Sequence, residues 1–174
     1  KLDIQYKNVY GKEDTLVTIQ IDMLLAEKFG MYYIDENGEK ARPLIIHRSS
    51  IGCYERTLAM LIEKYNGAFP LWLAPEQVRV LSLTDRTAGA AKGVAAQLTQ
   101  AGLRAEADVR SEKLGKKIRE AQLEKVPYVL VIGDKEAEDG VVSVRHRADG
   151  DLGVMKIEDF LTLAQAEIAS KVRK

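Results

Sequence analysis

The chain has 174 residues, and its 26 Lys and Arg residues are balanced by 26 Asp and Glu residues, so a uniformly basic nucleic-acid-binding protein is excluded and any basic surface must be local. The single cysteine, Cys53, excludes an internal disulfide and fits a reducing compartment. With no signal peptide and no apolar run near the roughly 18 residues of a membrane span, we expect a cytoplasmic protein that makes no membrane contact.

The first 65 residues are predicted to form mostly antiparallel sheet. Residues 15–22 are β-rich, with Thr18 and Gln20 on the polar face of the strand and valine and isoleucine on the other. Asn37-Gly38 is a strong hairpin dipeptide. The chain begins without methionine inside a predicted strand, which suggests a piece of a longer protein. We predict strands at residues 1–6, 15–22, 31–34 and 44–47, and a helical turn at residues 23–29.

Residues 45–65 are predicted to form a strand, a tight turn and a helix. Apolar residues recur on one helical face, at Tyr54, Leu58, Leu61, Ile62 and Tyr65. Arg56 lies in the first turn of this helix and off that face, where its rigid fork of donors could meet a phosphate. A solvated surface charge would occupy the same position, so the residues alone leave both interpretations open.

Residues 66–75 are predicted to mark a domain boundary, because Gly67, Pro70 and Pro75 interrupt the helical pattern. Strands and helices then alternate, which implies a parallel or mixed sheet covered by helices. We therefore predict an α/β (α+β) chain with domains at residues 1–75 and 76–174. In the second domain we predict strands at residues 78–83, 103–109, 128–132 and 141–147, a brief extended piece at 154–155, helices at 88–101, 114–125 and 158–171, and a turn at 133–140.

Two histidines and one cysteine are candidates for metal binding or catalysis. A zinc ion needs three or four ligands, and neither Cys53 nor His146 has ligand spacing to His47, so a supporting role for His47 stays open. We expect Cys53 to be a buried or half-buried thiol without a nucleophilic role, because no base partner is evident. We expect His146, between two arginines on an edge-like strand, to face solvent.

Residues 110–125 form the most basic stretch of the chain. They hold six basic and three acidic residues, a local net charge of +3. A solvated amphipathic helix and a nucleic-acid-binding helix are both consistent with this composition.

Two segments resemble a known family. RPLIIHRSSIGCYERTLAMLIE, residues 42–63, resembles the third signature motif of class II aminoacyl-tRNA synthetases, and its His-Arg pair resembles the threonine-specific branch. RSEKLGKKIREAQLEKVPYVLVIGD, residues 110–134, is similar to the anticodon-binding domain of bacterial-type threonyl-tRNA synthetases. The resemblance covers most of the chain. It implies the end of an antiparallel-sheet catalytic core followed by a mixed-sheet α/β anticodon-binding domain.

The resemblance implies a threonine–tRNA ligase. The parent enzyme would be a homodimer that activates threonine with ATP and magnesium and transfers it to tRNA(Thr). Arg56 matches the arginine that holds the ATP triphosphate, and its role would be to neutralise charge as the threonine carboxylate attacks the α-phosphate. Thr18 would lie near the adenine and Gln20 near the substrate, although the preceding Leu16-Val17 departs from the usual Cys-Gly.

The resemblance also implies a zinc ion in the parent enzyme. His47 would be one of its three ligands, and the other two would lie upstream of this chain. The ion would bind the amino and hydroxyl groups of threonine, which allows valine to be rejected. Because the upstream parts are missing, we expect this chain alone to be catalytically inactive.

Five residues fall where the family contacts the anticodon. Ser111 stands where asparagine is usual. An asparagine amide can pair with a base edge through a donor and an acceptor at once, whereas serine offers one rotatable hydroxyl. Lys125 replaces a frequent arginine and loses its bidentate geometry. The five are Ser111, Arg119, Lys125, Glu136 and Arg145.

Two alternatives stay open. Another class II synthetase with the same anticodon fold, such as the prolyl, histidyl or glycyl enzyme, is disfavoured by His47-Arg48 and by EKLGKKIREAQLEKVPY, residues 112–128. A non-catalytic RNA-binding or interaction module is disfavoured because a pure binder needs neither His47 nor Arg56. The upstream coding sequence would discriminate between them.

Overall fold

The computed structural model describes residues 1–171 and divides the chain into two compact units. The first unit is Lys1–Gly67, and the second starts at Ala68. The boundary therefore precedes the predicted one, since residues 68–75 belong to the second unit. Leu71 is 1% exposed, and its carbonyl accepts a hydrogen bond of 2.7 Å from the Gln77 side-chain amide. The apolar side chain and its hydrogen bond fix this segment to the second unit.

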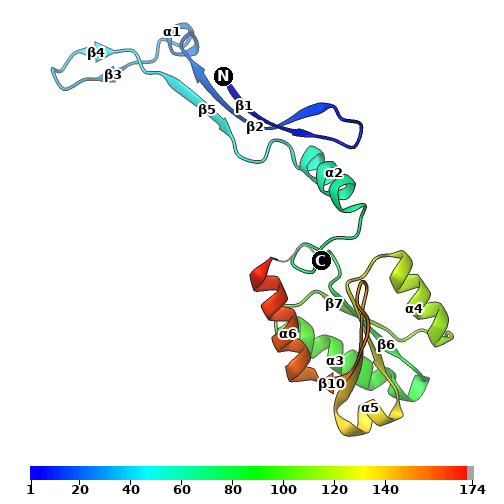
Figure 1. The fold of residues 1–174 in the computed structure, drawn as a ribbon. Helices are drawn as coiled ribbons and strands as arrows, with labels where there is room; N and C mark the ends of the chain where they lie inside the picture. Colours follow the sequence, from blue (N-terminus) through cyan, green and yellow to red (C-terminus); the bar gives the residue numbers. More distant parts are fainter. Residues whose placement is uncertain (172–174) are drawn as a thin grey trace. The chain divides into compact units, whose positions relative to one another are not determined.

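The first unit contains a three-stranded antiparallel sheet in the order β1-β2-β5 and a separate short hairpin, as Figure 1 shows. The predicted hairpin dipeptide Asn37-Gly38 lies between β3 and β4, and Gly38 has a φ of +83°. These elements confirm the antiparallel sheet and the helix predicted for this part. Their bounds are β1 Leu2–Lys7, β2 Glu13–Asp22, α1 Leu25–Lys28, β3 Tyr33–Ile34, β4 Lys40–Ala41, β5 Ile45–Ser49 and α2 Tyr54–Tyr65.

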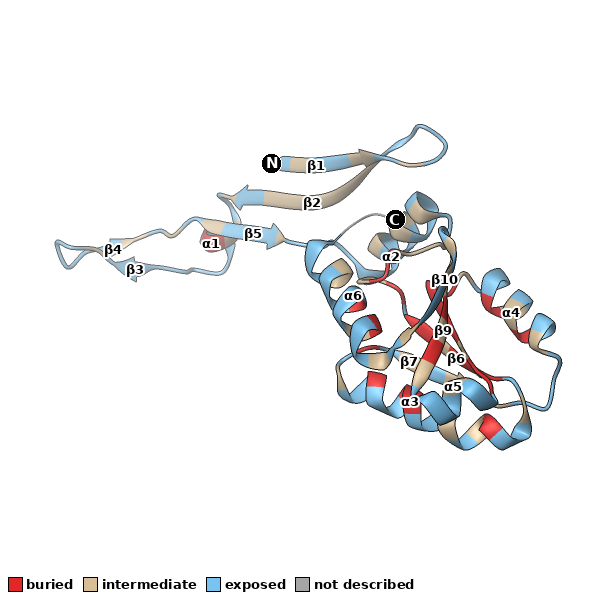
Figure 2. Ribbon diagram, turned by 60° about the horizontal axis from the view of Figure 1, so that its bottom comes forward, coloured by how far each residue is buried: buried red, intermediate tan, exposed pale blue. Residues whose placement is uncertain are grey.

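Within the described residues of the first unit, Ala26 is the only fully buried hydrophobic residue. Large apolar side chains are exposed on its sheet and on α2, among them Ile21, Ile46 and Leu58, and Figure 2 shows the unit almost without buried positions. Cys53 is also exposed, so the predicted burial of its thiol is wrong. The reason is that Cys53 directly precedes α2 in a unit with few atoms to cover it.

The second unit is a five-stranded mixed sheet in the order β10-β9-β8-β6-β7. The three strands β6, β7 and β8 are parallel, and β9 and β10 are antiparallel additions at one side. This arrangement confirms the mixed sheet expected from alternating strands and helices. The elements are β6 Val78–Ser82, η1 Asp85–Thr87, α3 Ala88–Gln100, β7 Ala105–Asp108, α4 Leu114–Leu123, β8 Tyr128–Ile132, α5 Asp134–Asp139, β9 Val141–His146, β10 Gly150–Lys156 and α6 Ile157–Ser170.

Helices cover both faces of this sheet (Figure 1). On one face, α3 and α6 pack against alternate strand residues such as Val80 and Leu130. On the other face, α4 packs through Ala121 against Leu81 and Val129. Because successive side chains of a strand point to opposite faces, the continuous apolar run of β8 serves both layers.

Three expectations for the second unit are corrected. Residues 133–140 contain the helix α5, whose first turn is stabilised by the Glu136 carboxylate accepting a hydrogen bond from the Gly133 N–H at 3.0 Å. β10 is longer than residues 154–155, because it pairs along the whole length of β9. His146 is 4% exposed instead of facing solvent. It shares the inner face of β9 with Val144, and its ring lies 4.7 Å from that of Tyr128.

Candidate functional site

The first group of predicted site residues lies on two neighbouring strands of the first unit. Gln20 of β2 pairs directly with His47 of β5, and Thr18 pairs with Ser49. Directly opposed residues of an antiparallel pair project to the same side, so Thr18, Gln20 and His47 share one face of the sheet. The Thr18 hydroxyl donates a 2.8 Å hydrogen bond to Asp3 on β1, while Gln20 is exposed.

His47 is half-exposed and faces one carboxylate. Its Nε2 lies 3.5 Å from an Asp22 carboxylate oxygen. The pKa of Asp22 is lowered chiefly because its carboxylate accepts hydrogen bonds from the N–H groups of Leu25 and Leu24. No cluster of three possible metal ligands occurs in residues 1–171. His47 can therefore supply one ligand, and this chain's described residues do not complete the donor set that zinc requires.

Arg56 lies in the first turn of α2, as predicted, and is exposed. Its guanidinium donates a 3.2 Å hydrogen bond to the Thr15 carbonyl of β2, which keeps it near the sheet. The preceding turn requires Gly52, which has a φ of +76° and where a Cβ would lie 2.8 Å from the Leu16 carbonyl oxygen. This close approach brings the start of α2 next to β2, the strand that carries Thr18 and Gln20.

The second group of predicted residues is distributed around α4 and β8 of the second unit. Ser111 is exposed in the loop before α4, and Arg119 is exposed on α4 itself. Lys125 lies between α4 and β8 with a φ of +60°. Glu136 lies on α5 with one oxygen committed to the Gly133 N–H, and Arg145 is half-buried on β9, opposite Asp151 of β10.

The fold brings Arg145 close to α4 and separates Lys125 from Glu136. A cavity of about 60 Å³ is lined by Arg145 together with Ile118 and Gln122 of α4. Lys125 precedes the first residue of β8, whereas Glu136 follows its last residue. With a rise of about 3.3 Å per residue, the first and last residues of β8 lie about 13 Å apart, with Lys125 before one end and Glu136 after the other. The predicted residues therefore form an extended surface and not a compact pocket.

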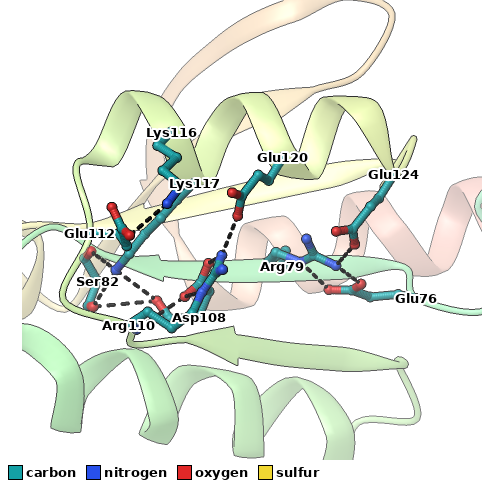
Figure 3. A network of polar contacts seen from close by, with 10 residues as sticks. All are labelled: Glu76, Arg79, Ser82, Asp108, Arg110, Glu112, Lys116, Lys117, Glu120 and Glu124. Atoms are coloured by element: carbon teal, nitrogen blue, oxygen red, sulfur yellow. Dashed lines mark hydrogen bonds and ion pairs between the residues drawn. The ribbon is translucent and has the colours of Figure 1, made fainter.

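Several of the six basic residues in residues 110–125 are engaged within the protein, and Figure 3 shows three of them, Arg110, Lys116 and Lys117. Arg110 donates to both Asp108 oxygens and to Glu120, which raises the pKa of the arginine, and Lys116 pairs with Glu112 at 2.6 Å. Lys117 is buried, at 1% exposed. The local charge of +3 is therefore not all available to a ligand.

Lys117 lies at the carboxyl ends of two parallel strands. Figure 3 shows it reaching from α4 toward Ser82 and Asp108, the last residues of β6 and β7. Its Nζ donates to their carbonyls at 3.0 and 3.2 Å and lies 3.3 Å from the Ser82 hydroxyl. Counting charges missed this role, although Lys117 is spaced three residues from Leu114 and four from Ala121, which places it on the apolar face of the helix.

Arginine side chains also fix α4 to the sheet. Arg79 of β6 forms ion pairs with Glu76 and with Glu124 at the end of α4. The hydrogen bond that Arg79 donates to Glu124 lowers the pKa of that carboxyl group. Arg110 makes the equivalent link through Glu120 one turn earlier. Glu120 and Glu124 thus face the sheet, whereas Glu112 pairs with Lys116. Arg119 makes no ion pair within the part of the chain that the structure describes.

None of the helices formed by residues 1–171 has the length and apolar character needed to cross a membrane.

Comparison with known proteins connects this geometry to a family. A family model described as an anticodon binding domain matches residues 77–167, which include α4, β8, α5 and β9. The chain is 63% identical over 171 residues to a threonine–tRNA ligase of Clostridium perfringens strain SM101 and 60% identical over 173 residues to one of Clostridium botulinum strain Eklund 17B. These matches cover 98% and 99% of the chain but 27% of each relative, so the chain spans about a quarter of their length.

A solved structure agrees with both the sequence match and the fold. The RNA-binding domain of threonyl-tRNA synthetase from Cryptosporidium parvum Iowa II matches with a TM-score of 0.83 and 33% identity, over 95% of this chain and 42% of that one. The family model covers more than half of the 174 residues. The chain therefore belongs to the anticodon-binding-domain family and resembles threonine–tRNA ligases along almost its whole length.

Proposed function

We propose that the second unit recognises the anticodon loop of tRNA(Thr), as part of a threonine–tRNA ligase. The observation that carries this proposal is the extended surface around α4 and β8. Ser111 is exposed in the loop before α4, Arg119 is exposed on α4, and Arg145 lines the cavity beside that helix. Bases in an anticodon loop are unpaired and can be splayed onto such a surface. Arg145 and Glu136 would meet base edges, while Arg119 and Lys125 would lie near phosphate or base.

The length of this surface suits several consecutive nucleotides. Lys125 and Glu136 flank β8 at its two ends, so contacts to successive bases can be spread along the strand. Glu136 keeps one carboxylate oxygen for a base donor, since the other accepts the Gly133 N–H. Ser111 offers one rotatable hydroxyl, so its contribution to base discrimination is expected to be smaller than that of Arg145.

The test is a titration of the whole chain with an anticodon stem-loop of tRNA(Thr) and with base-swapped loops. Arg145→Ala should weaken binding of the cognate loop by about 1–3 kcal/mol and reduce discrimination between loops. Lys92→Ala on α3, at the opposite side of the sheet, is the matched control and should change neither quantity. Equal affinity of the unaltered chain for all loops would refute anticodon recognition.

The activity of the whole ligase belongs to the same proposal. In a cytoplasmic homodimer, threonine would be activated by ATP with magnesium and then transferred to tRNA(Thr). Arg56 would neutralise triphosphate charge, and Thr18 and Gln20 would contact adenosine and substrate. The nearness of Arg56 to the strand that carries Thr18 and Gln20 supports these roles. We expect this chain alone to show no threonine-dependent pyrophosphate exchange.

His47 would contribute one zinc ligand in the parent enzyme. The ion, when bound, would polarise and recognise the amino and hydroxyl groups of threonine. Within this chain, His47 faces Asp22, which can orient its ring. Elemental analysis after dialysis should find no stoichiometric zinc in this chain and one equivalent in the whole enzyme; retention of zinc by the unaltered chain and its loss in His47→Ala would contradict the incomplete site.

A further inference from the structure

Arg147 lines the same cavity as Arg145, beside the surface proposed to bind RNA. Its guanidinium is half-buried and donates to main-chain carbonyls instead of to a carboxylate: it contacts the Lys125 carbonyl, the Phe69 carbonyl at 2.9 Å and the Ala68 carbonyl at 3.3 Å. Arg147 makes no ion pair with any acidic residue among residues 1–171. Burial lowers its pKa. The side chain is therefore occupied in holding backbone together.

The first segment that it holds is the Lys125 turn, residues 124–127 between α4 and β8. Lys125 is one of the few non-glycine residues with a positive φ, a conformation that needs support from its surroundings. Arg147 contacts this turn twice, because its side chain reaches the Lys125 carbonyl and its N–H donates to the Pro127 carbonyl at 2.8 Å. The direction of the Lys125 side chain depends on this backbone conformation.

The second segment is the start of the second unit. Ala68 and Phe69 follow directly after Gly67, the last residue of the first unit. The Arg147 guanidinium thus joins Lys125, a residue of the predicted anticodon surface, to residues 68–69, with which the second unit begins. Hydrogen bonds from a charged donor to carbonyls are among the stronger ones in proteins, so this junction can transmit a constraint between the two segments.

We propose that Arg147 is a positioning residue of the RNA-binding surface: it fixes the Lys125 turn against residues 68–69, so that ordering of one segment is coupled to ordering of the other. The role of Lys125 in RNA binding rests on the proposed function, whereas the coupling between the two segments does not. Because such coupling is reciprocal, RNA binding at the turn should also order residues 68–69.

Arg104 provides a matched control. Its guanidinium also donates to main-chain carbonyls near the start of the second unit, those of Ala74 at 2.8 Å and Trp72 at 3.2 Å. Among the residues that the structure describes, it makes no hydrogen bond to the Lys125 turn. Loss of either arginine removes hydrogen bonds from residues 68–74, and only loss of Arg147 removes support from residues 124–127. A general loosening of the domain would therefore appear in both variants.

The experiment uses the full chain carrying Arg147→Met or Arg104→Met, and it has an RNA-free arm. Amide hydrogen exchange without RNA should become at least fivefold faster in Arg147→Met, both in peptides covering residues 124–128 and in those covering 68–72. In Arg104→Met the increase should be confined to peptides that cover residues 72–77. Unchanged exchange at residues 124–128 in Arg147→Met would overturn the coupling, independently of the affinity of the chain for RNA.

The RNA arm measures stem-loop affinity in a double-mutant cycle. Arg147→Met should weaken binding about as much as Lys125→Met, roughly fivefold or more, and the double variant should be little worse than either, because effects through one shared group are not additive. Arg147→Lys, which lacks the planar fork, should be intermediate. Additive losses would mean that Arg147 contacts the RNA itself, and equal losses in Arg104→Met would mean that only overall stability matters; either result overturns the positioning role.

The two proposals fail separately. If the unaltered chain binds no stem-loop, the proposed function is refuted and the RNA part of this inference with it, while the exchange data still decide whether Arg147 couples the two segments. If the chain binds its cognate loop and slows exchange at residues 68–72 when bound, but not in Arg147→Met, both proposals are supported.

Discussion

At the scale of single residues, the charges in residues 110–125 have different roles that their sequence does not distinguish. Lys117 is buried and contacts carbonyls, and Arg110 is held by two carboxylates, whereas Arg119 is exposed. A basic residue whose donors are already bonded within its own protein is less available to a nucleic acid, because the internal contacts must first be broken. Lys117 and Arg110 therefore belong to the support of the surface and Arg119 to the surface itself.

Lys117→Met should destabilise the second unit by about 1–3 kcal/mol. The Ser82 and Asp108 carbonyls would lose their charged donor, the buried Lys117 ammonium group, and this loss should exceed the relief from no longer burying that charge. Urea unfolding followed by circular dichroism measures the change. Lys116→Met, at an exposed ion pair, is the control and should stay within about 0.5 kcal/mol. A more stable Lys117→Met protein would show that desolvation is the larger cost.

Arg110→Gln should raise the pKa of Asp108. The Arg110 side chain is the main reason that this pKa lies below its ordinary value, and the Arg110 N–H adds to the effect. A carboxylate whose pKa is lower in the folded state stabilises that state above its unfolded pKa, near 4, and the contribution is lost as the pH falls through the folded pKa. The variant should therefore unfold at a higher pH on acidification. Carboxyl carbon shifts of Asp108 measured by NMR test this, with Arg119→Gln as a control that should leave them unchanged.

At the scale of elements, α4 is an amphipathic helix whose acidic residues face the sheet and whose remaining basic residues face outward. Glu120 and Glu124 are drawn to Arg110 and Arg79, one turn apart, and Ala121 packs between them against Leu81. This packing fixes the rotation of the helix about its axis. The orientation of Arg119, and the position of the Lys125 turn that follows, are consequences of contacts with β6 and β7.

The salt dependence of RNA binding should reflect this division. If only Lys113, Arg119 and Lys125 of this stretch contact phosphates, log Kd plotted against log salt concentration should have a slope of about 2, since each contact to single-stranded RNA contributes about 0.7. All six basic residues would give a slope of about 4. Stem-loop titrations between low and moderate salt measure the slope, and Arg119→Met should lower it by about 0.7. A slope near 4 would show that RNA displaces the internal ion pairs.

At the scale of the whole molecule, the two units differ in what holds them together. The second unit has apolar cores on both faces of its sheet, whereas the first exposes large apolar side chains on nearly every element. Burial of apolar surface is the main favourable term in folding. The first unit therefore has much less apolar burial of its own to stabilise it than the second unit has.

Separate expression of the units should show this difference. Residues 68–174 should unfold cooperatively in urea, and residues 1–67 should lack a cooperative transition and bind the dye ANS. A shorter version that starts at residue 76 should be less stable than residues 68–174 by about 2–5 kcal/mol, because it lacks the buried Leu71 side chain and leaves Gln77 without its acceptor. Equal stability of the two versions would support a boundary at residue 75 instead.

The sequence by itself determined most of the elements and the family. Periodic apolar residues predict α2 and α4, the run YVLVI predicts the central strand β8, and Asn37-Gly38 predicts a hairpin turn, because these signals arise from local backbone geometry. The short strand β4 that follows this turn was not predicted. The motif at residues 110–134 likewise predicts the family that residues 77–167 match. The sequence did not predict the full length of β10 or the helix α5, because their local sequence patterns are weak. Pairing with β9 extends β10, and the hydrogen bond from the Gly133 N–H to Glu136 stabilises α5.

Only the tertiary structure decided which of the candidate residues are accessible. His146 is buried because strand alternation turns it toward Tyr128, and Cys53 is exposed because its unit has little to cover it. Lys117 and Arg147 are engaged by carbonyls that lie far from them in the sequence, and the packing of α4 against the sheet brings Glu120 to Arg110. Burial and long-range pairing depend on the three-dimensional packing of all the elements, so a pattern within one stretch of sequence cannot specify them.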